Sequence, residues 1–571
     1  MTQDKTAPSE VEHIKAQSRH LRGTIAETLA DDSAVKFSDA DEQLVKFHGF
    51  YQGYNRDTAT ARKKMKLDKE WEMMLRVKVP GGRLTSAQYL ALDALTDLFS
   101  NGTLRVTSRQ GLQFHCVMKG DIKPLIARVN DTLLTTFGGC GDVVRNTMAV
   151  PSPEHNPVVK AIERLADEIS RETLPKTTAY HEIWINGEPY KEPTQDTPDP
   201  LYGQSWLPRK FKIAIATPED NTVDALTNDI GLIAVHDGHT VQGYNVYIGG
   251  GFGMKHGNPA TYPRMAEALG FVEAPDVIPL CKAIIAFQRD HGDRSDRQHA
   301  RLKYVVTERG MDFCKTKIET YFGKPLKPLK KTPPLQVKDY LGWHAQGNGL
   351  FSLGLPVTSG RIKDTEKHSL RKALCELLQT YAMPLILMPT EDIILYDIAE
   401  EHKNAITALF KSHNVALKED HTPVELWAMS CVALPTCGKA LTEGERVREP
   451  LIALVSHALA LYGLQQEKLS VRITGCPNGC SRPYTGDIGI VGRAPDLYSL
   501  YVGGDFAGTR LSHKVADMVP VDRIGDFLSP FFSAFAQERT GPDDSFGDFC
   551  DRIGADRRLA LATASGAAKK L

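Results

Sequence analysis

Three short sequence matches recur in the same order in the two halves of this 571-residue chain. Chance explains one such match easily and three in a fixed order poorly. We therefore interpret the chain as two diverged copies of one unit, with a site expected at their pseudo-symmetric interface. The matches pair residues 82–84 with 360–362, 149–152 with 433–436 and 244–250 with 498–504, at offsets of 278, 284 and 254 residues.

Within the first copy, strand-like and helix-like segments alternate, which predicts an α+β fold. Residues 76–79 alternate as a strand and end at a Pro-Gly-Gly turn, and Ser86 to Phe99 has the apolar spacing of a helix. Residues 103–118 predict two strands around a turn, and residues 125–134 predict a second helix. The Pro-rich residues 324–334 are the expected linker between the halves.

Composition excludes several classes of protein. The formal net charge is −1, whereas nucleic-acid binders usually carry a large positive excess. The first thirty residues contain no apolar signal segment, and the longest apolar stretch, residues 451–464, is too short to span a bilayer. We expect a cytoplasmic protein with no membrane or nucleic-acid partner. Ten cysteines in a reducing compartment are poor disulfide candidates, and Cys116, Cys281, Cys314 and Cys375 are interpreted as small buried residues.

The strongest chemical signal is two cysteine pairs, Cys431-x5-Cys437 and Cys476-x3-Cys480. Four thiolates are the usual ligands of a [4Fe–4S] cluster. A structural zinc site is the alternative, although zinc sites favour gaps of two to four residues within each pair. The matched positions of the first half hold Thr147 and Pro153, so only one half is predicted to bind metal.

These motifs, Cys431-x5-Cys437 followed by Thr-Gly-Cys-Pro-Asn-Gly-Cys at residues 474–480, resemble the signature of the sulfite and nitrite reductase haemoprotein family. The similarity runs from residues 21–27 to residues 546–549. It implies a [4Fe–4S] cluster held by all four cysteines, with Cys480 also bridging to the iron of a sirohaem. It also implies two pseudo-symmetric halves, each with a ferredoxin-like subdomain and a sirohaem-binding mixed α/β subdomain.

The domain boundaries that we expect follow from the repeat and the resemblance together. They are 1–65 for an N-terminal extension with possible partner docking, 66–150 for the first ferredoxin-like half-domain, 151–335 for the first sirohaem and sulfite domain, 336–425 for the second ferredoxin-like half-domain and 426–571 for the cluster and second sirohaem domain.

Fixed positive charge is needed to bind a compact dianion such as sulfite. Lys210 and Lys212 share one face of a predicted strand, residues 210–216, whose other face is apolar. Such lysines face either water or a polar cavity, and only the resemblance selects the cavity. It matches Arg76, Arg145, Lys210 and Lys212 to the sulfite-binding residues and Arg105, Arg109, Gln113 and His115 to residues that line the macrocycle.

Sirohaem carries eight carboxylates, so its pocket should be basic as well. Residues 294–303 are rich in arginine, and on a helix three of these arginines would share a face. A solvent-exposed amphipathic helix is the alternative. The glycines at 249–251 allow close backbone approach to a flat ligand, although a glycine run alone is a weak signal. The candidate cofactor-binding residues here are Gly249, Gly250, Gly251, Arg294, Arg297, Arg301 and Lys303.

The resemblance is nearest to the bacterial NADPH-dependent type, which implies assimilatory reduction of sulfite to sulfide in cysteine biosynthesis. The chain shows no convincing flavin or nicotinamide motif, so NADPH, FAD and FMN are expected on a separate flavoprotein subunit. A ferredoxin-dependent sulfite or nitrite reductase is the alternative within the family. A zinc-stabilised scaffold without enzymatic activity is the alternative outside it.

Overall fold

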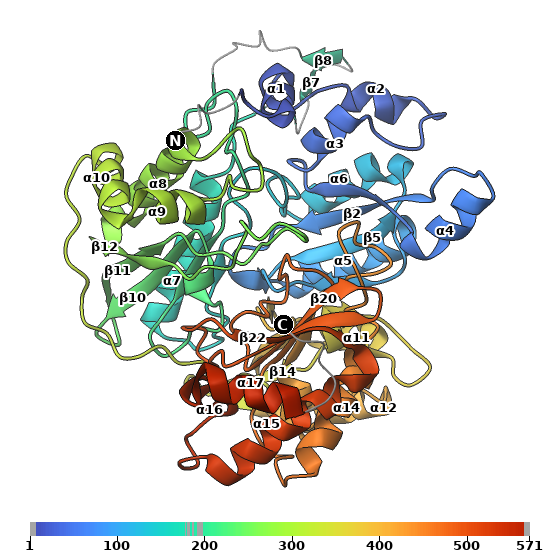
Figure 1. The fold of residues 1–571 in the computed structure, drawn as a ribbon. Helices are drawn as coiled ribbons and strands as arrows, with labels where there is room; N and C mark the ends of the chain where they lie inside the picture. The colour runs from blue at the N-terminus through green and yellow to red at the C-terminus, as the bar shows by residue number, and fades with distance from the viewer. Residues whose placement is uncertain (1–6, 178, 180–182, 186–187, 191–197, 565–571) are drawn as a thin grey trace.

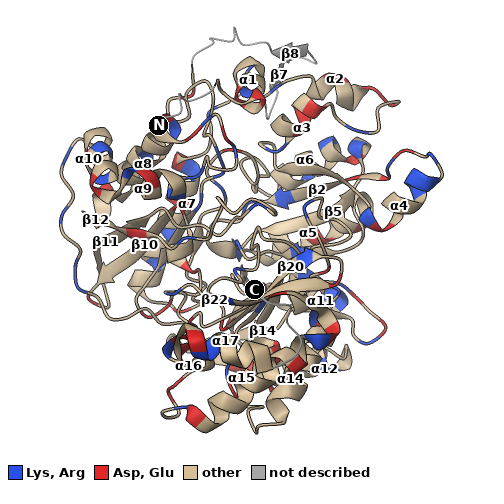
Figure 2. Cartoon of the chain, in the orientation of Figure 1, with Lys and Arg blue, Asp and Glu red and all other residues tan. Residues whose placement is uncertain are grey.

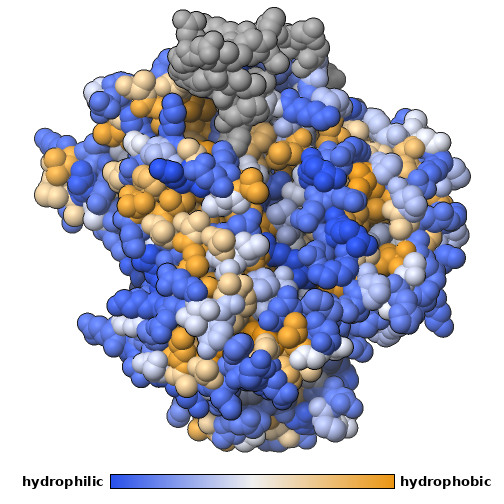
Figure 3. All heavy atoms as spheres, turned by 180° about the vertical axis from the view of Figure 1, so that it is seen from behind, coloured by the Kyte–Doolittle hydropathy of each residue, from blue (hydrophilic) through white to orange (hydrophobic). Residues whose placement is uncertain are grey.

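The computed structural model describes residues 7–177, 179, 183–185, 188–190 and 198–564. Within these residues the strands form four five-stranded sheets and one small hairpin, β7–β8 (Ile183–Ile185 and Glu188–Tyr190). Figure 1 shows the first half in blue and green beside the second half in yellow and red. No helix in the described part of the chain has the length and hydrophobicity needed to cross a membrane. On the face in Figure 3, hydrophobic residues are interspersed with hydrophilic ones.

Two of the sheets are the ferredoxin-like pair, and they share one hydrophobic core. Helix α5 (Ser86–Phe99) begins at Thr85 through a capping box with Gln88, which explains why its predicted bounds coincide with the observed ones. Helices α6 (Ile122–Asp131), α11 (Leu370–Tyr381) and α12 (Lys403–Ser412) complete this core. In order across the first sheet, the strands are β1 (Phe50–Tyr54), β2 (Trp71–Val77), β5 (Leu112–Val117), β4 (Leu104–Val106) and β15 (Arg361–Ile362). In order across the second sheet, they are β13 (Gly342–Ala345), β14 (Phe351–Leu355), β17 (Ile393–Ile398), β16 (Leu385–Leu387) and β3 (Arg83–Leu84).

The repeated segment that begins at Gly82 in one half and Gly360 in the other forms a reciprocal strand exchange. Strand β3 of the first half pairs with β16 of the second, and β15 of the second half pairs with β4 of the first. Each sheet is therefore completed by the other half of the chain. This exchange fixes the two halves against each other and brings their loops to a shared interface.

The other two sheets have the same strand order, which confirms the internal duplication. In each, three parallel strands are followed by two antiparallel ones. The first-half sheet is β6 (Met148–Ala149), β9 (Ile213–Ala216), β10 (Ile230–His236), β11 (Val241–Ile248), β12 (Glu267–Glu273), and the second-half sheet is β18 (Ala428–Ser430), β19 (Val471–Thr474), β20 (Ile488–Ala494), β21 (Leu497–Val502), β22 (His513–Pro520).

Helices cover one face of each of these sheets. The first is packed by α7 (Pro157–Glu172), α8 (Val277–His291), α9 (Leu302–Arg309) and α10 (Met311–Phe322), and the second by α14 (Arg448–Ala460), α15 (Ile524–Glu538), α16 (Phe546–Arg552) and α17 (Gly554–Ala564). Residues 324–334, the expected linker, contain no helix or strand.

Two local predictions were wrong. The arginine-rich residues 294–301 form turns, and a helix begins only at Leu302. The carboxylate of Asp293 accepts hydrogen bonds from the N–H groups of Ser295 and Asp296, and such local side-chain turns compete with helix formation. The strand expected from Lys210 begins instead at Ile213, and before it Phe211 forms an isolated bridge to Val144.

Asp392 lies buried in the turn between β16 and β17, and burial raises its pKa to about 7. Its carboxylate accepts hydrogen bonds from Val357 N–H at 2.9 Å and from the Thr390 hydroxyl at 2.8 Å. The folded-state pKa lies above the unfolded value of about 3.9, so the folded protein retains a proton that the unfolded chain loses. The stability that this proton contributes is present below pH ~4 and is lost as the pH rises through about 7.

We expect Asp392→Asn to be more stable than the wild type by roughly 1–3 kcal/mol at pH 8, because the amide is never charged. The advantage should shrink toward zero near pH 4. Thermal unfolding of both proteins across this range checks the prediction. An advantage of equal size at pH 4 and pH 8 would contradict it.

Candidate active site

The four cysteines of the predicted cluster lie on two neighbouring loops. Cys431 and Cys437 follow β18, whereas Cys476 and Cys480 follow β19. Because β18 and β19 are parallel neighbours, both loops leave the same edge of the sheet. The loops are tied together by the hydrogen bonds from Cys431 N–H to Ile473 O at 3.1 Å and from Leu441 N–H to Gly475 O at 2.8 Å.

Polar hydrogens point at the thiol sulfurs. The N–H of Gly475 donates to Cys431 Sγ at 3.2 Å, and the Asn478 amide donates to Cys476 Sγ at 3.4 Å. Donors of this kind stabilise sulfur that carries negative charge and tune the potential of a cluster. A Cβ atom on Gly475 would lie 2.6 Å from Ala433 Cβ, so the close approach of the two loops requires glycine there.

Burial raises the pKa of the Cys431 and Cys437 thiols, and the thiol of Cys480 acts on both in the same direction. Burial likewise raises the pKa of Cys476 to about 11, again with Cys480 as the next cause. The four thiols are thus close enough to influence one another. Among the described residues, no group of three or more His, Cys, Asp or Glu side chains is arranged so that it could hold a metal ion. Four thiolates with N–H donors are nevertheless the ligand type of an iron–sulfur cluster.

A dense group of cations faces these loops from the first half. Arg76 and Arg145 converge on the segment at residues 139–141: Arg76 Nη1 lies 3.0 Å from Cys140 Sγ, and Arg145 Nε donates to Gly141 O at 2.8 Å. Burial lowers the pKa of Lys210 and Lys212 well below the ordinary value, and neighbouring cations lower both further. Among these cations, Lys212 has the largest effect on the pKa of Lys210, and Arg109 has the largest effect on the pKa of Lys212.

The cationic group and the cysteines meet at Cys480. The Ser108 hydroxyl of the first-half hairpin donates to Cys480 O at 2.9 Å. The Cys480 thiol acts to raise the pKa of both Lys212 and Lys439, which places it beside them. The structure therefore brings together Arg76, Arg109, Arg145, Lys210 and Lys212 with the four predicted cluster ligands.

The hairpin β4–β5 contributes a second layer of predicted residues. Arg105 lies opposite Gln113 in the sheet and bonds to Glu391 at 3.0 Å and to Ser430 O at 2.8 Å, beside the cysteine loop. His115 is buried, and burial together with the adjacent Arg361 holds its pKa well below the ordinary value. Arg361 Nη1 donates to His115 Nδ1 at 3.1 Å, so the neutral ring carries its proton on Nε2.

Several buried N–H donors at this interface have no hydrogen-bond partner among the described residues, although Arg105 Nε lies 3.7 Å from a carboxylate oxygen of Glu445. Buried donors are normally satisfied, so a cluster of unsatisfied N–H groups indicates a ligand that accepts hydrogen bonds. An anionic macrocycle with many carboxylates fits such a donor set. The unsatisfied atoms are Arg105 Nε, Arg109 Nε, His115 Nε2, Arg301 Nε and Arg482 Nε.

The glycine run at 249–251 has a packing role. A Cβ atom on Gly251 would lie 2.5 Å from Arg301 Nη1, so glycine lets this buried guanidinium pass. Arg301 in turn pairs with the buried Asp229 at 2.7 Å. Lys303 donates to Gly253 O at 3.0 Å and to neighbouring carbonyls, and burial lowers its pKa to about 7.

Arg294 and Arg297 are placed against the N-terminal helix α1 (Glu10–Gln17). Arg294 pairs with the buried Glu12, and Arg297 pairs with Asp142 at 2.8 Å. Lys15 of the same helix lies 3.7 Å from Asp142. The segment around α1 is therefore anchored to the first half by buried ion pairs, and both arginines already have carboxylate partners.

Sequence reasoning missed several residues of this interface. Arg482 is buried two positions after Cys480 and pairs with Asp224 of the first half at 2.7 Å. Lys439 lies two positions after Cys437, beside the thiols of that motif. Proximity to the cysteine motifs was the available signal for both. Glu391 carried no such signal, because its contact with Arg105 spans 286 residues.

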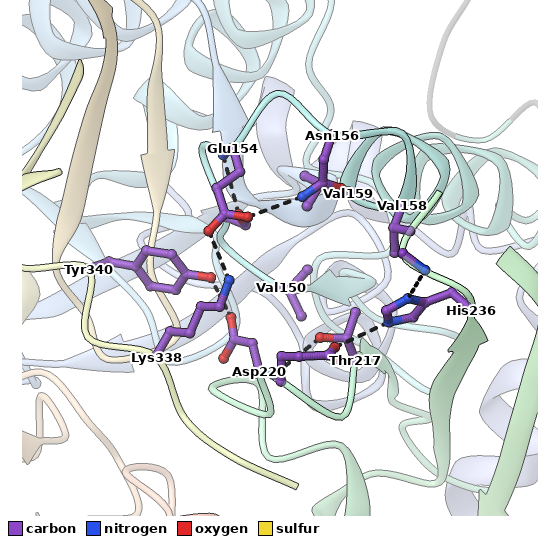
Figure 4. A pocket seen from close by; sticks show the side chains of 13 residues that line it. Val150, Glu154, Asn156, Val158, Val159, Thr217, Asp220, His236, Lys338 and Tyr340 are labelled. Carbon is purple, nitrogen blue, oxygen red and sulfur yellow. Dashed lines mark hydrogen bonds and ion pairs between the residues drawn. The ribbon is translucent and has the colours of Figure 1, made fainter. Parts of the chain in front are cut away.

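The first half contains a different structure at the place that corresponds to the cysteine loops. A cavity of about 250 Å³ is lined there by the loops that follow β6 and β9, which are the counterparts of β18 and β19. Its polar side chains are paired with one another. Figure 4 shows Lys338 beside Glu154, at 2.8 Å, and Tyr340 beside Asp220, to which its hydroxyl donates at 2.8 Å. His236 pairs with Glu219 at 3.1 Å. The duplicated edge thus holds the segment just after the linker, through Lys338 and Tyr340, in one half and presents thiols in the other.

The sequence is similar to known proteins over nearly its whole length. The family profile "Nitrite/Sulfite reductase ferredoxin-like half domain" matches residues 68–131, and "Nitrite and sulphite reductase 4Fe-4S domain" matches residues 166–326, in the half without the four cysteines. The chain is 41% identical to "Sulfite reductase [ferredoxin]" of Synechococcus elongatus, over 96% of this chain and 90% of that protein. It is 40% identical to "Sulfite reductase [NADPH] hemoprotein beta-component" of Myxococcus xanthus, over 96% of each.

A solved structure, "Structure of Mycobacterium tuberculosis NirA protein", has the same fold. It covers 97% of this chain and 98% of its own, with a TM-score of 0.76 and 21% sequence identity.

Proposed function

Because the chain belongs to the nitrite and sulfite reductase family, as an oxidoreductase of the sulfite reductase haemoprotein type, we propose that it reduces sulfite to sulfide in sulfate assimilation and cysteine biosynthesis. The proposal rests on one observation above all. The cysteine loops of the second half and the crowded cations of the first half meet at Cys480.

In this proposal Cys431, Cys437, Cys476 and Cys480 would hold a [4Fe–4S] cluster, and Cys480 would also help to hold a sirohaem. These two groups, when bound, supply the single-electron chemistry of the six-electron reduction. The unsatisfied donors of Arg105, Arg109, His115, Arg301 and Arg482 bind the sirohaem carboxylates. Gln113, Lys303 and the glycines at 249–251 line the same pocket. Arg294 supports its rim through Glu12, and Arg297 supports it through Asp142.

Arg76, Arg145, Lys210 and Lys212 bind the sulfite oxygens in this proposal. Burial and neighbouring cations disfavour the charged forms of Lys210 and Lys212, so an anion beside these two lysines would compensate their charge. The same groups are placed to stabilise negative charge and to deliver protons as each oxygen leaves as water.

We propose that electrons originate from NADPH and arrive through a separate flavoprotein subunit carrying FAD and FMN. The name of the Myxococcus xanthus relative supports this source. Ferredoxin as the donor is the second candidate, and the name of the Synechococcus elongatus relative favours it. Steady-state turnover with each donor at equal concentration separates the two.

Protein purified from cells that synthesise sirohaem tests the central proposal. We expect the optical bands of an isobacteriochlorin, more iron than one haem accounts for, acid-labile sulfide, and faster turnover of sulfite than of nitrite with reduced methyl viologen. A colourless protein that contains zinc and no labile sulfide would overturn the cofactor assignment. A clear preference for nitrite would overturn the substrate assignment alone.

A further inference from the structure

Helix α4 (Arg56–Lys64) and the turn after it form a basic projection, which we call the α4 ridge and define as residues 56–69. Six Lys or Arg side chains and two Asp lie in these fourteen residues, although the whole chain has a net charge of −1. Figure 2 shows the blue of these basic residues at the right-hand edge of the molecule. None of the residues of α4 is buried.

The charge of the α4 ridge is left largely uncompensated at its outer end. Within the described part of the chain, Lys63, Lys64 and Lys66 take part in no ion pair. Two large apolar side chains stand between and beside them, Met65 at 61% exposed and Leu67 at 52% exposed. Exposed apolar side chains inside a ring of like charge are typical of a surface that binds an oppositely charged protein.

The inner end of the α4 ridge is fastened to the first cysteine loop. The N–H of Arg56 donates to Pro435 O at 3.1 Å, and its Nη1 donates to Cys437 O at 3.3 Å and to Ala440 O at 3.5 Å. Asp57 pairs with Arg446, which follows the same loop, at 2.6 Å. The loop itself reaches the surface, because Gly438 and Lys439 are exposed.

We propose that the α4 ridge, with the exposed tip of the loop at residues 434–439, is the docking surface for an acidic electron-carrier protein. The inference rests on the proposed function, since it names where the electrons of that reaction enter. Charge complementarity argues for an acidic partner, and the Arg56 contacts place that partner against the ligand loop of the cluster. Met65 and Leu67 supply the apolar contact at the centre, and the lysines steer the encounter.

The variant Lys63→Glu/Lys64→Glu tests the proposal. Sulfite turnover is measured in the loaded enzyme with three donors: an acidic [2Fe–2S] ferredoxin, an acidic flavodoxin, and reduced methyl viologen, which needs no docking surface. We expect the KM for at least one acidic carrier to rise about tenfold or more and its dependence on salt to weaken. Turnover with methyl viologen should stay unchanged.

The matched control is Lys317→Glu/Lys331→Glu. Lys317 lies on α10, on the opposite side of the molecule from α4 (Figure 1), and Lys331 lies in the linker; both are exposed. This control changes the net charge equally and should leave the KM for the carriers unaltered. The docking surface would be overturned if both variants raised the KM for the carriers equally. It would also be overturned if Lys63→Glu/Lys64→Glu left turnover with the carriers unchanged. It would also fall if neither carrier supported turnover while methyl viologen did. Failure with methyl viologen as well would instead overturn the proposed function.

Discussion

Replacing Cys431 by alanine is expected to remove iron and acid-labile sulfide from the protein and to lower sulfite turnover by more than about 100-fold. The estimate is a lower bound, because loss of a residue that merely orients a metal ligand already costs roughly 10–100-fold. Cys431 is buried, accepts a hydrogen bond from Gly475 N–H at 3.2 Å and lies on the loop that bonds to β19. Its substitution therefore acts at the centre of the ligand set while the sheet remains intact.

The matched control for this experiment is Cys550→Ala. Cys550 is also a fully buried thiol of the second half, but it belongs to α16 and packs in the hydrophobic core. Both substitutions remove one buried sulfur, so both carry a similar packing cost. Only Cys431→Ala should lose iron and labile sulfide. Retention of both in Cys431→Ala, or their loss in Cys550→Ala, would show that the four-thiol ligand set is wrong.

Much of the fold was predictable because its signals are local or repeated. Helix α5 was predicted with its observed bounds, since its apolar spacing and the capping box at Thr85 are both encoded within a few residues. The duplication was visible because the glycine-rich ends of β11 and β21 kept their sequence in both halves. The two sheets confirm that inference with the same strand order.

What could not be predicted depends on contacts between distant residues. The match between Gly82 and Gly360 was seen, yet nothing in a two-residue strand shows that β3 and β15 pair with the opposite half. The arginines at 294 and 297 were read as one face of a helix. Their conformation is instead set by the Asp293 turn and by ion pairs to Glu12 and Asp142, the first of them 282 residues away.

The candidate site divides in the same way. The four cysteines were predictable from spacing, because thiolate ligands must be close in space and a tight loop keeps them close in sequence. The cations were identified only through family resemblance, since a single lysine or arginine usually faces solvent. Their grouping is tertiary: Arg76 comes from β2, Arg145 precedes β6, and Lys210 and Lys212 precede β9.

Replacing Lys210 by methionine is expected to lower kcat/KM for sulfite by about 100- to 1000-fold, which is the usual cost of losing one group that stabilises transition-state charge. Lys212→Met should have an effect of similar size. The two effects should not add, because the lysines act on the same anion. Lys403→Met is the control. Lys403, the first residue of α12, is also half-buried, but its ammonium lies 4.0 Å from the centroid of the Phe351 ring. This substitution should leave kcat/KM unchanged.

A second readout separates a role in binding from a role in folding. Burial and neighbouring cations lower the pKa of Lys210, so its charged form is disfavoured in the folded protein without an anion. Below the unfolded pKa of about 10.4, where the unfolded chain keeps its proton, that penalty reduces stability, and methionine removes it. We therefore expect Lys210→Met to raise the thermal midpoint of the anion-free protein while it lowers turnover, as is usual where function places like charges together. Sulfite should stabilise the wild type against heat and have little effect on the variant.

Unchanged sulfite turnover in a fully loaded Lys210→Met enzyme would remove this lysine from the substrate site. A lowered thermal midpoint together with lowered turnover would instead assign Lys210 a structural role.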